Sequence, residues 1–203
     1  MNTAIYTISR QYGSGGRIVG KEIAEILDIP FYDNTLLRQE AIKSGIDISH
    51  YESDTQKKSQ RKSLLQSIYQ GVYGGGQSIP GDDQLALSQF KAIREIAKKG
   101  PCVFIGRCAD HVLQERPNVI SVFVTASLQS RIKRAVEEYG VAKDEAEKIV
   151  KAMDKEREDY YQFYAGRSWS DADSYDLTVS TDRMSCRDAA EIIIEAAHRM
   201  TYK

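Results

Sequence analysis

The stretch SRQYGSGGRIVGKEIA, residues 9–24, constrains the fold of this chain more than any other segment, because four of its residues from 13 to 20 are glycines. The apolar run AIYTIS precedes the glycines and predicts a short β-strand over 4–9. An amphipathic helix is predicted over 17–28, and its apolar residues share one face: Val19, Ile23, Ile26 and Leu27. Backbone N–H groups at a helix N-terminus bind anions well, and glycines let a ligand approach the backbone closely. The segment therefore predicts a phosphate-binding turn between a strand and a helix.

Strands and helices are predicted to alternate along the rest of the chain. Further strands are expected at 29–33, 101–106, 118–125 and 175–181. Helices are expected at 34–45, 84–100, 128–140, 142–164 and 186–200. Ser127 is placed to cap the third of these helices, and Ser185 with Asp188 forms a capping box for the last. The alternation predicts one three-layer α/β domain over 1–203, while residues 46–84 are polar and irregular and predict a surface loop.

Composition excludes several classes of protein. The chain has 28 Lys and Arg against 29 Asp and Glu, so its net charge of −1 implies neither a nucleic-acid surface nor a membrane surface. No apolar run approaches the length of a membrane span, and no signal peptide is predicted. The three cysteines form no metal-ligand pattern, which is typical of reduced thiols in a cytoplasmic protein. The oligomeric state stays open.

The glycine turn has two registers on the phosphate-loop pattern G-x-x-x-x-G-K-[ST]. A register that ends on Lys21 puts Glu22 where a Mg²⁺-binding hydroxyl belongs, and it delays the helix. In a helix that starts near Gly16, Lys21 instead lies roughly opposite the buried face, so it is interpreted as a solvent-facing lysine. The preferred register puts the turn at 11–16, directly after the strand. Arg17 then lies at the start of the helix and is the nearest cation for the β and γ phosphates of a nucleotide.

A dinucleotide site is an alternative interpretation of the same turn. The G-x-G at 13–15 precedes a helix, and Asp33 ends the second strand at the distance expected of a ribose-binding acid. Tyr139 and Lys143 form a Y-x-x-x-K pair. Ile18, however, occupies the place of the third glycine of such a motif. A glycine turn that binds no ligand is the remaining alternative.

Arginines follow several of the predicted strands. Arg107 comes just after the strand 101–106, at the carboxyl edge where open α/β sheets bind ligands. Arg131 and Arg134 are three residues apart on a helix and are therefore neighbours. Arg157 and Arg167 occur further on, in and after the long charged helix. Phosphoryl transfer needs positive charge around a highly negative group, so this placement favours a phosphotransferase.

Motifs along nearly the whole chain resemble the cytidylate kinase-like family, relatives of the P-loop nucleoside-monophosphate kinases. They are ISRQYGSGGRIVGKEIA, FYDNTLL, FIGRCADHVL, VFVTASLQSRIKRA, DKEREDYYQFYAGRSW and SYDLTVST. The resemblance implies a P-loop kinase fold with a five-stranded parallel sheet. It also implies a monophosphate-binding insert at about 34–84 and a lid at about 154–172.

The resemblance assigns roles to residues of this chain. The donor ATP would bind the loop residues Gly13, Ser14, Gly15, Gly16 and Arg17. The acceptor would bind Asp33, Arg38 and Arg107, and Asp110, three residues after Arg107, is a further acceptor candidate although the family has its acid directly after the arginine. The arginines assigned to catalysis with Arg17 are Arg131, Arg134 and Arg157, and Arg167 is a further candidate by position only. Cytidylate kinases have a lysine and then a hydroxyl residue where this chain has Gly16 and Arg17. Mg²⁺ would therefore need Ser14, or only phosphates and water.

The sequence thus predicts a kinase that transfers the γ-phosphoryl group of Mg·ATP to a nucleoside monophosphate, CMP or dCMP being favoured. Two alternatives remain open. One is another small-molecule phosphotransferase on the same fold. The other is a nucleotide-binding protein without catalysis that acts as a sensor or an interaction partner.

Overall fold

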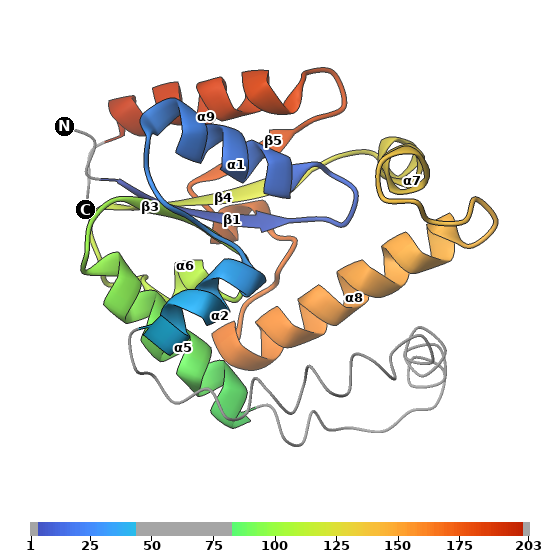
Figure 1. The fold of residues 1–203 in the computed structure, drawn as a ribbon. Helices are drawn as coiled ribbons and strands as arrows, with labels where there is room; N and C mark the ends of the chain where they lie inside the picture. The colour runs from blue at the N-terminus through green and yellow to red at the C-terminus, as the bar shows by residue number, and fades with distance from the viewer. Residues whose placement is uncertain (1–3, 44–82, 201–203) are drawn as a thin grey trace.

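The computed structural model describes residues 4–43 and 83–200, in which strands alternate with helices along most of the chain (Figure 1). The elements are β1 (Ile5–Arg10), α1 (Gly16–Leu27), β2 (Phe31–Tyr32), α2 (Asn34–Lys43), α5 (Asp83–Ala97), β3 (Cys102–Ile105), α6 (Ala109–Val112), β4 (Val119–Thr125), α7 (Leu128–Glu137), α8 (Ala146–Ala165), η1 (Ala172–Ser174), β5 (Leu177–Ser180) and α9 (Cys186–Arg199). The predicted strands and main helices are therefore confirmed. Residues 46–82 of the predicted loop, and most of the predicted insert, lie outside the described residues, whereas the last two residues of that loop, 83 and 84, belong to α5.

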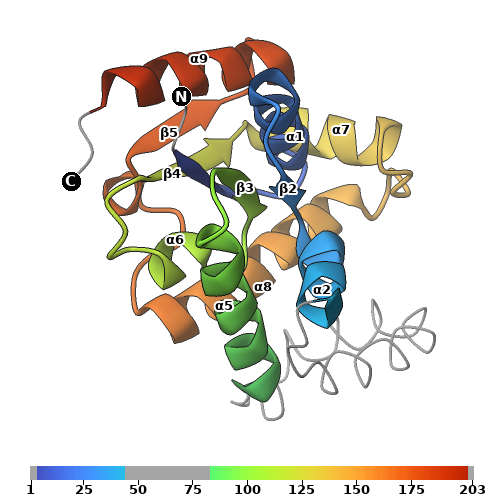
Figure 2. The ribbon, with the colours of Figure 1, turned by 60° about the vertical axis from the view of Figure 1, so that its left-hand side comes forward.

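The five strands form one parallel sheet in the order β2-β3-β1-β4-β5. Strand β1 is central, and Ile5 pairs with Cys102 of β3 on one side and with Val119 of β4 on the other. All five strands point the same way, so the turns that follow β1, β2 and β3 meet at one edge of the sheet (Figure 2). The predicted five-stranded parallel sheet is confirmed.

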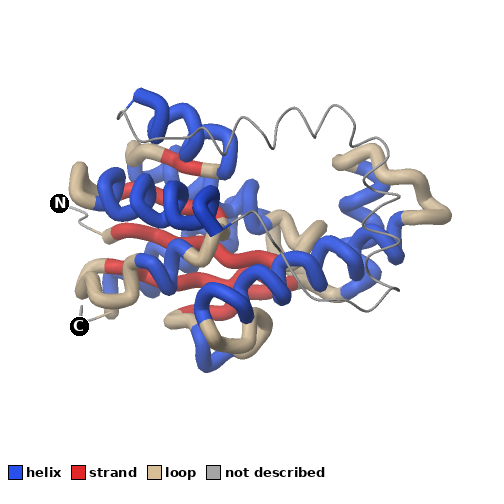
Figure 3. The backbone as a smooth tube through the Cα atoms, turned by 90° about the horizontal axis from the view of Figure 1, so that it is seen from below, coloured by secondary structure: helices blue, strands red, loops and turns tan. Residues whose placement is uncertain are grey.

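Helices cover both faces of the sheet, which gives the predicted three layers (Figure 3). Tyr6 and Ile8 of β1 lie on the face covered by α1 and α9, in a cluster with Val19 and Ile193. Ile5 faces the other side, where α5, α6 and the end of α8 pack. Because successive strand residues point to opposite faces, the apolar runs of the sequence fill two cores at once.

Helix α1 shows how the sequence pattern sets burial. Val19 and Ile23 are fully buried against the sheet, as predicted from helical periodicity. Lys21 is exposed and pairs with Glu25 at 3.4 Å, which confirms the prediction of a solvent-facing lysine. Ile26, predicted on the buried face, is 36% exposed, because in the last turn Leu27 packs against the core instead.

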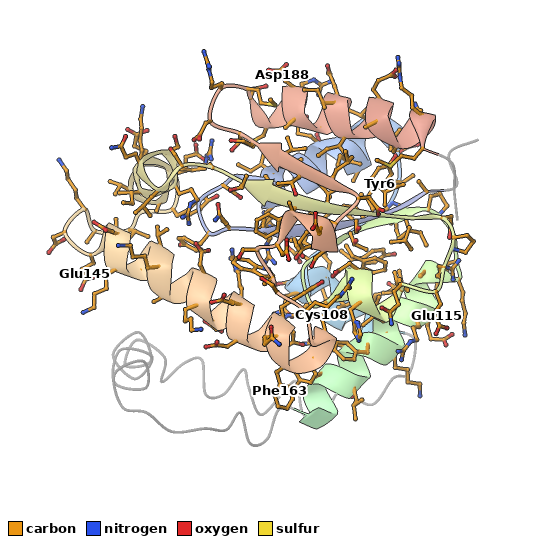
Figure 4. The ribbon with its side chains drawn as sticks, turned by 180° about the vertical axis from the view of Figure 1, so that it is seen from behind. Tyr6, Cys108, Glu115, Glu145, Phe163 and Asp188 are labelled. Atoms are coloured by element: carbon orange, nitrogen blue, oxygen red, sulfur yellow. The ribbon has the colours of Figure 1, made fainter. Side chains whose placement is uncertain are left out.

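The helix caps follow the sequence closely. Ser127 Oγ accepts a hydrogen bond from Ser130 N at the start of α7. Ser185 and Asp188 form the reciprocal capping box of α9, and Figure 4 labels Asp188 at this end of the helix. Helix α8 begins at Ala146 rather than at residue 142. Sequence periodicity also missed α6, which is a single turn.

Among the described residues, no helix is long and apolar enough to cross a membrane. The three cysteines are free thiols, as predicted. Cys102 and Cys108 are buried, and burial raises the pKa of each to about 12, so they are inert at neutral pH. Cys186 is only partly buried, at the start of α9.

Candidate functional site

The turn between β1 and α1 has the geometry of an anion site. Gly13 and Gly15 both have φ of +78°, in the left-handed region that glycine adopts without strain. A Cβ on Gly13 would lie 2.5 Å from Arg131 O, so the close approach also requires glycine. Gly15 is the N-cap of α1 and supplies no side-chain cap. The first-turn N–H groups of α1 are therefore not capped by a side chain of the N-cap residue, and such groups bind phosphate.

Side chains from distant elements hold the carbonyl groups of this turn. Arg134 Nη1 donates to Gly13 O at 2.8 Å, and Thr181 Oγ1 donates to Ser14 O at 2.7 Å. Cys186 Sγ lies 3.8 Å from Gly15 O, within reach of a weak S–H hydrogen bond. With the carbonyls of residues 13–15 fixed toward the protein, the turn keeps one backbone conformation.

Arg131, on α7, also holds this turn in place. It is buried, and its guanidinium donates to Ala126 O at 3.1 Å and to Tyr12 O at 3.3 Å. The same group forms an ion pair with Asp154 of α8. Asp154 also accepts a hydrogen bond from Tyr12 N at 2.7 Å. The sequence analysis assigned no role to Asp154, although it opens the block DKEREDYY that carried part of the resemblance.

Ser14 is fully buried, and its hydroxyl donates to Gln11 O at 2.9 Å. This contact stabilises the turn itself. No group of three or more His, Cys, Asp or Glu side chains suited to a metal occurs in the described part of the chain. A metal role for Ser14 stays a prediction, whereas Mg²⁺ held by phosphates and water needs no side chain.

Arg17, at the start of α1, contacts Asp33 at the end of β2. The Arg17 Nη2 and Nε atoms lie 2.7 Å and 3.1 Å from Asp33 Oδ2. Asp33 Oδ1 accepts from the backbone N–H groups of Thr35 and Leu36, which caps α2. Partial burial raises the pKa of Asp33, but the hydrogen bonds from Leu36 and Arg17 outweigh it and lower the pKa overall. The predicted donor cation and the predicted acceptor acid are thus partners here.

A cavity of about 280 Å³ lies at the carboxyl edge of the sheet. Three arginines from different elements line it: Arg10 at the end of β1, Arg107 after β3, and Arg157 from α8. Arg107 lies over the Tyr160 ring at 5.5 Å, and Arg157 Nη1 donates to Arg10 O at 2.9 Å. The structure therefore brings two of the predicted arginines together with one that was not predicted.

The backbone beside this cavity is strained. Arg107 and Cys108 have φ of +58° and +52°, values that cost non-glycine residues about 1–3 kcal/mol each. Cys108 lies in the interior of the molecule, near α6 and α8 (Figure 4). Its burial and the adjacent helix α6 hold this backbone in place. Strained backbone of this kind is typical of functional sites, and here it accompanies the arginine that lines the cavity.

Arg10 is the site residue that the sequence analysis missed. The sequence pattern predicted no role for it. Arg10 is partly buried and lines the cavity. Burial lowers its pKa well below the usual value, and the nearby charges of Arg157 and Arg107 lower it further.

Asp110 and Arg167, two more predicted site residues, lie outside the 280 Å³ cavity. Asp110 is buried and accepts a hydrogen bond from Tyr161 Oη at 2.5 Å, while Arg167 Nη2 is 3.7 Å from its carboxylate. Burial raises the pKa of Asp110 although Tyr161 and Arg167 both lower it. Both residues line a separate cavity of about 640 Å³, beside the amino end of β4. The 280 Å³ cavity does not include them.

The remaining predicted residues fall on described elements only in part. Arg38 is on α2, and its side chain lies outside the described part of the structure. The predicted lid at 154–172 comprises the second half of α8 and the segment after it, where Tyr161 and Trp169 are buried. Tyr161 and Trp169 therefore pack into the core. Phe163, at the end of α8, is exposed (Figure 4).

The order of the strands contradicts the alternative of a dinucleotide-binding site. In a dinucleotide-binding fold the second strand lies beside the first, and its terminal acid reaches the ribose. Here β2 pairs with β3 and is separated from β1. Asp33 is occupied by Arg17 and by the first turn of α2.

The sheet order, the glycine turn after the central strand and the arginines at the same edge define a P-loop kinase fold. A gluconokinase from Sinorhizobium meliloti 1021 has this fold, with a TM-score of 0.58, 15% identity, and coverage of 98% of this chain and 93% of its own. A shikimate kinase from Acinetobacter baumannii in complex with shikimate gives a TM-score of 0.53 at 14% identity, covering 98% and 95%. An uncharacterized protein from Eubacterium ventriosum ATCC 27560 is more similar, with a TM-score of 0.73 and 28% identity over 97% and 99%.

Residues 5–183 match the model of the cytidylate kinase-like family, and the chain belongs to that family. The cytidylate kinase of Pyrobaculum arsenaticum is 24% identical over 192 residues, which cover 94% of this chain and 91% of the relative. That of Pyrobaculum aerophilum is 25% identical over 193 residues, with the same coverage. Family and fold together support a kinase acting on a nucleotide or another small molecule.

Proposed function

We propose that this protein transfers the γ-phosphoryl group of Mg·ATP to a nucleoside monophosphate, with CMP and dCMP as the preferred acceptors. One observation carries the proposal: the uncapped glycine turn and three arginines share the carboxyl edge of the sheet. Two phosphate-bearing ligands bound there would have their phosphates adjacent, which is what transfer requires. The preference for cytidine nucleotides comes from the cytidylate kinases among its relatives.

The donor phosphates bind the turn in this proposal. Backbone N–H groups of Gly13–Gly16 contact phosphate oxygens, and Arg17 neutralises the charge of the β and γ phosphates. Mg²⁺ would bind phosphate oxygens and water and would neutralise charge that develops on the leaving phosphate. The Ser14 hydroxyl, the predicted protein ligand, would have to leave its hydrogen bond to Gln11 O to bind it. Gly13 and Gly15, with φ of +78°, have the backbone that such a turn needs.

The acceptor binds beside the donor. Arg107 reaches its phosphate from the cavity wall, while Asp33 and Arg38 hold the rest of the nucleotide. Asp110 supports this region through Tyr161 and α8. In the reaction, an acceptor phosphate oxygen forms a bond to the γ phosphorus, the bond to the β,γ-bridging oxygen breaks, and ADP leaves.

The other assigned arginines act around the transferred group. Arg157 lines the cavity and is the member of this set best placed to contact a phosphate. Arg131 and Arg134 hold the backbone of the turn, so they position the donor. Arg167 lies 3.7 Å from the Asp110 carboxylate, beside the separate 640 Å³ cavity, so its predicted catalytic role is the least supported of the set.

The test is ADP release from Mg·ATP with CMP, dCMP, UMP, AMP, GMP, shikimate and no acceptor. The proposal expects strong stimulation by CMP or dCMP, and loss of that stimulation in Arg107→Met. Arg187→Met is the matched control, because Arg187 is exposed and pairs with Glu22 on the protein surface. Stimulation by shikimate alone would support another small-molecule phosphotransferase instead.

A second candidate function is nucleotide binding without catalysis. It is favoured by Gly16, which occupies the place of the phosphate-loop lysine. Under this alternative ATP binds, but no acceptor of the panel is phosphorylated. Calorimetric binding of a non-hydrolysable ATP analogue, measured beside the ADP assay, separates the two candidates.

A further inference from the structure

At positions 10 and 16 this chain has a cation and a glycine in the reverse order to a phosphate loop. When the pattern G-x-x-x-x-G-K-[ST] is aligned on the observed turn, it begins at residue 10 and its lysine falls at residue 16. This chain has arginine where the pattern has its first glycine, and glycine where the pattern has its lysine. Because α1 begins at Gly16, the structure fixes this register.

The side chain of Arg10 leaves no room for a side chain at position 16. A Cβ built on Gly16 would lie 2.4 Å from Arg10 Cβ and 3.0 Å from Arg10 Cγ. Contacts below 3.0 Å require something to shift, and the nearest atom belongs to the stem of Arg10 beside its backbone. Val124 Cβ, the third neighbour, lies 3.1 Å away and would have to give by only a few tenths of an ångström. A lysine at 16 therefore does not fit while Arg10 is present.

A second glycine makes room for the guanidinium of Arg10. A Cβ on Gly106 would lie 2.1 Å from Arg10 Nη1. Gly106 follows β3, the strand next to β1, so the arginine extends from the end of one strand across the end of the other. Its guanidinium thereby borders the 280 Å³ cavity, together with Arg107 and Arg157.

The charges around Arg10 are unbalanced. Within residues 4–43 and 83–200, no carboxylate forms an ion pair with Arg10. Three of its charged neighbours, Arg157, Arg107 and Arg17, disfavour the charged guanidinium, and Asp33 favours it. Glu156 also lines the cavity. A partly buried arginine that lies beside other arginines without a carboxylate partner destabilises the protein until an anion binds.

We propose that Arg10 is a phosphate-binding cation of this site and supplies the charge that a phosphate-loop lysine supplies elsewhere. In this proposal Gly16 is glycine because the stem of Arg10 fills the space of a side chain there. The inference rests on the proposed function for its substrate, since it places Arg10 against the transferred or acceptor phosphate. Its anion-binding part is tested without turnover.

The first experiment measures thermal unfolding of the protein with and without inorganic pyrophosphate. Arg10→Met is expected to raise the melting temperature of the ligand-free protein, because one of three like charges around the cavity is removed, and to abolish the stabilisation by pyrophosphate. An arginine with a purely structural role would lower the melting temperature when replaced. Arg187→Met, the same change on the surface, is expected to keep the pyrophosphate shift.

The second experiment moves the cation to the lysine position. Arg10→Gly is expected to fold and to lose about 100-fold in phosphoryl transfer, as when one transition-state donor is removed. Gly16→Lys alone is expected to be destabilised by contact with Arg10. The double variant Arg10→Gly/Gly16→Lys is expected to recover stability and at least about a tenth of the pyrophosphate affinity and transfer rate.

Three outcomes would overturn the inference. They are unchanged pyrophosphate binding in Arg10→Met, absence of pyrophosphate binding in the unmodified protein, and a double variant no better than Arg10→Gly. If no nucleotide is phosphorylated while pyrophosphate binding still depends on Arg10, the proposed kinase function fails and the anion site stands. If CMP is phosphorylated at the same rate with and without Arg10, the proposed kinase function stands and the role assigned to Arg10 fails.

Discussion

Arg17 and Asp33 form a two-pronged contact across the turn and the end of β2, with Arg17 Nη2 2.7 Å and Nε 3.1 Å from the same carboxylate oxygen. The other oxygen of Asp33 caps α2. This pair therefore joins α1, the helix that follows the glycine turn, to α2, the helix that starts the predicted insert. A ligand phosphate that binds Arg17 must compete with Asp33 for its guanidinium.

Replacement of Arg17 by alanine is expected to change activity far more than stability. The Arg17 side chain is 62% exposed, and exposed ion pairs contribute between 0 and about 1 kcal/mol. Loss of a phosphate-binding cation would lower transfer about 100-fold. Urea unfolding and the ADP assay measure the two effects. Lys21→Ala, an equally exposed lysine of the same helix, should alter neither.

Acid should weaken the contact of Asp33 with Arg17 and with α2. The pKa of Asp33 is lowered from its usual value of 3.8, so its contribution to stability is fully present above that value. The contribution is lost as pH falls through the lower pKa of the folded state. Asn is also a good N-cap but has no charge. The unfolding free energy of the unmodified protein should therefore exceed that of Asp33→Asn at pH 7, and this difference should shrink only in acid.

A difference between the two proteins that stays constant from pH 7 to the acid limit would contradict this expectation. It would mean that Asp33 stabilises α2 without the help of its charge.

Asp154 is expected to be a principal stabiliser of the glycine turn. It pairs with buried Arg131 and accepts from Tyr12 N. Asp154→Ala would leave Arg131 buried without its partner, at a cost of about 3 kcal/mol in unfolding free energy. Urea unfolding tests the magnitude. Glu147→Ala, which breaks an exposed pair with Lys151 on the same helix, should cost less than about 0.5 kcal/mol.

The same variant separates a positioning role from a merely structural one. If Asp154 fixes the turn, Asp154→Asn should keep the hydrogen bond from Tyr12 N and retain more pyrophosphate affinity than Asp154→Ala. Equal affinities of the two variants would show that the turn keeps its shape without this contact.

Two glycines with similar backbone conformations should respond differently to alanine. Gly13 and Gly140 have φ of +78° and +68°, so each alanine incurs left-handed strain of about 1–2 kcal/mol. Nothing lies within 4 Å of a Cβ on Gly140, whereas a Cβ on Gly13 would be 2.5 Å from Arg131 O. Gly13→Ala should therefore be the more destabilised of the two by chemical unfolding, and it should also lose pyrophosphate binding.

The strands, the helices and most of their ends could be predicted because their signals are local. Alternating and helical patterns of apolar residues act over a few positions, and the Ser185–Asp188 capping box acts over three. The glycine turn was predictable for the same reason, since positive φ at Gly13 and Gly15 is a property of single residues. Sequence pattern alone missed α6, because one helical turn carries no period.

The partners of the charged side chains could not be predicted in this way. The sequence showed arginines after successive strands, but it did not show that Arg10 borders the same cavity as Arg107 and Arg157. It also placed Asp110 with the acceptor residues, whereas the structure places its carboxylate against Tyr161. A long side chain ends several ångströms from its backbone, and its contacts depend on elements far away in sequence.

The sequence by itself determined a three-layer α/β chain with a phosphate-type turn and a set of arginines at strand ends. The tertiary structure decided which of them meet, because β1 lies between β3 and β4 and so brings residues about a hundred positions apart to one edge. Burial then separates their roles. Arg131 is buried with a carboxylate partner and holds the turn, while Arg10 borders the cavity among other arginines. The sequence gives the type of each residue, but its charged neighbours are set only when the strands pair and bring distant segments together.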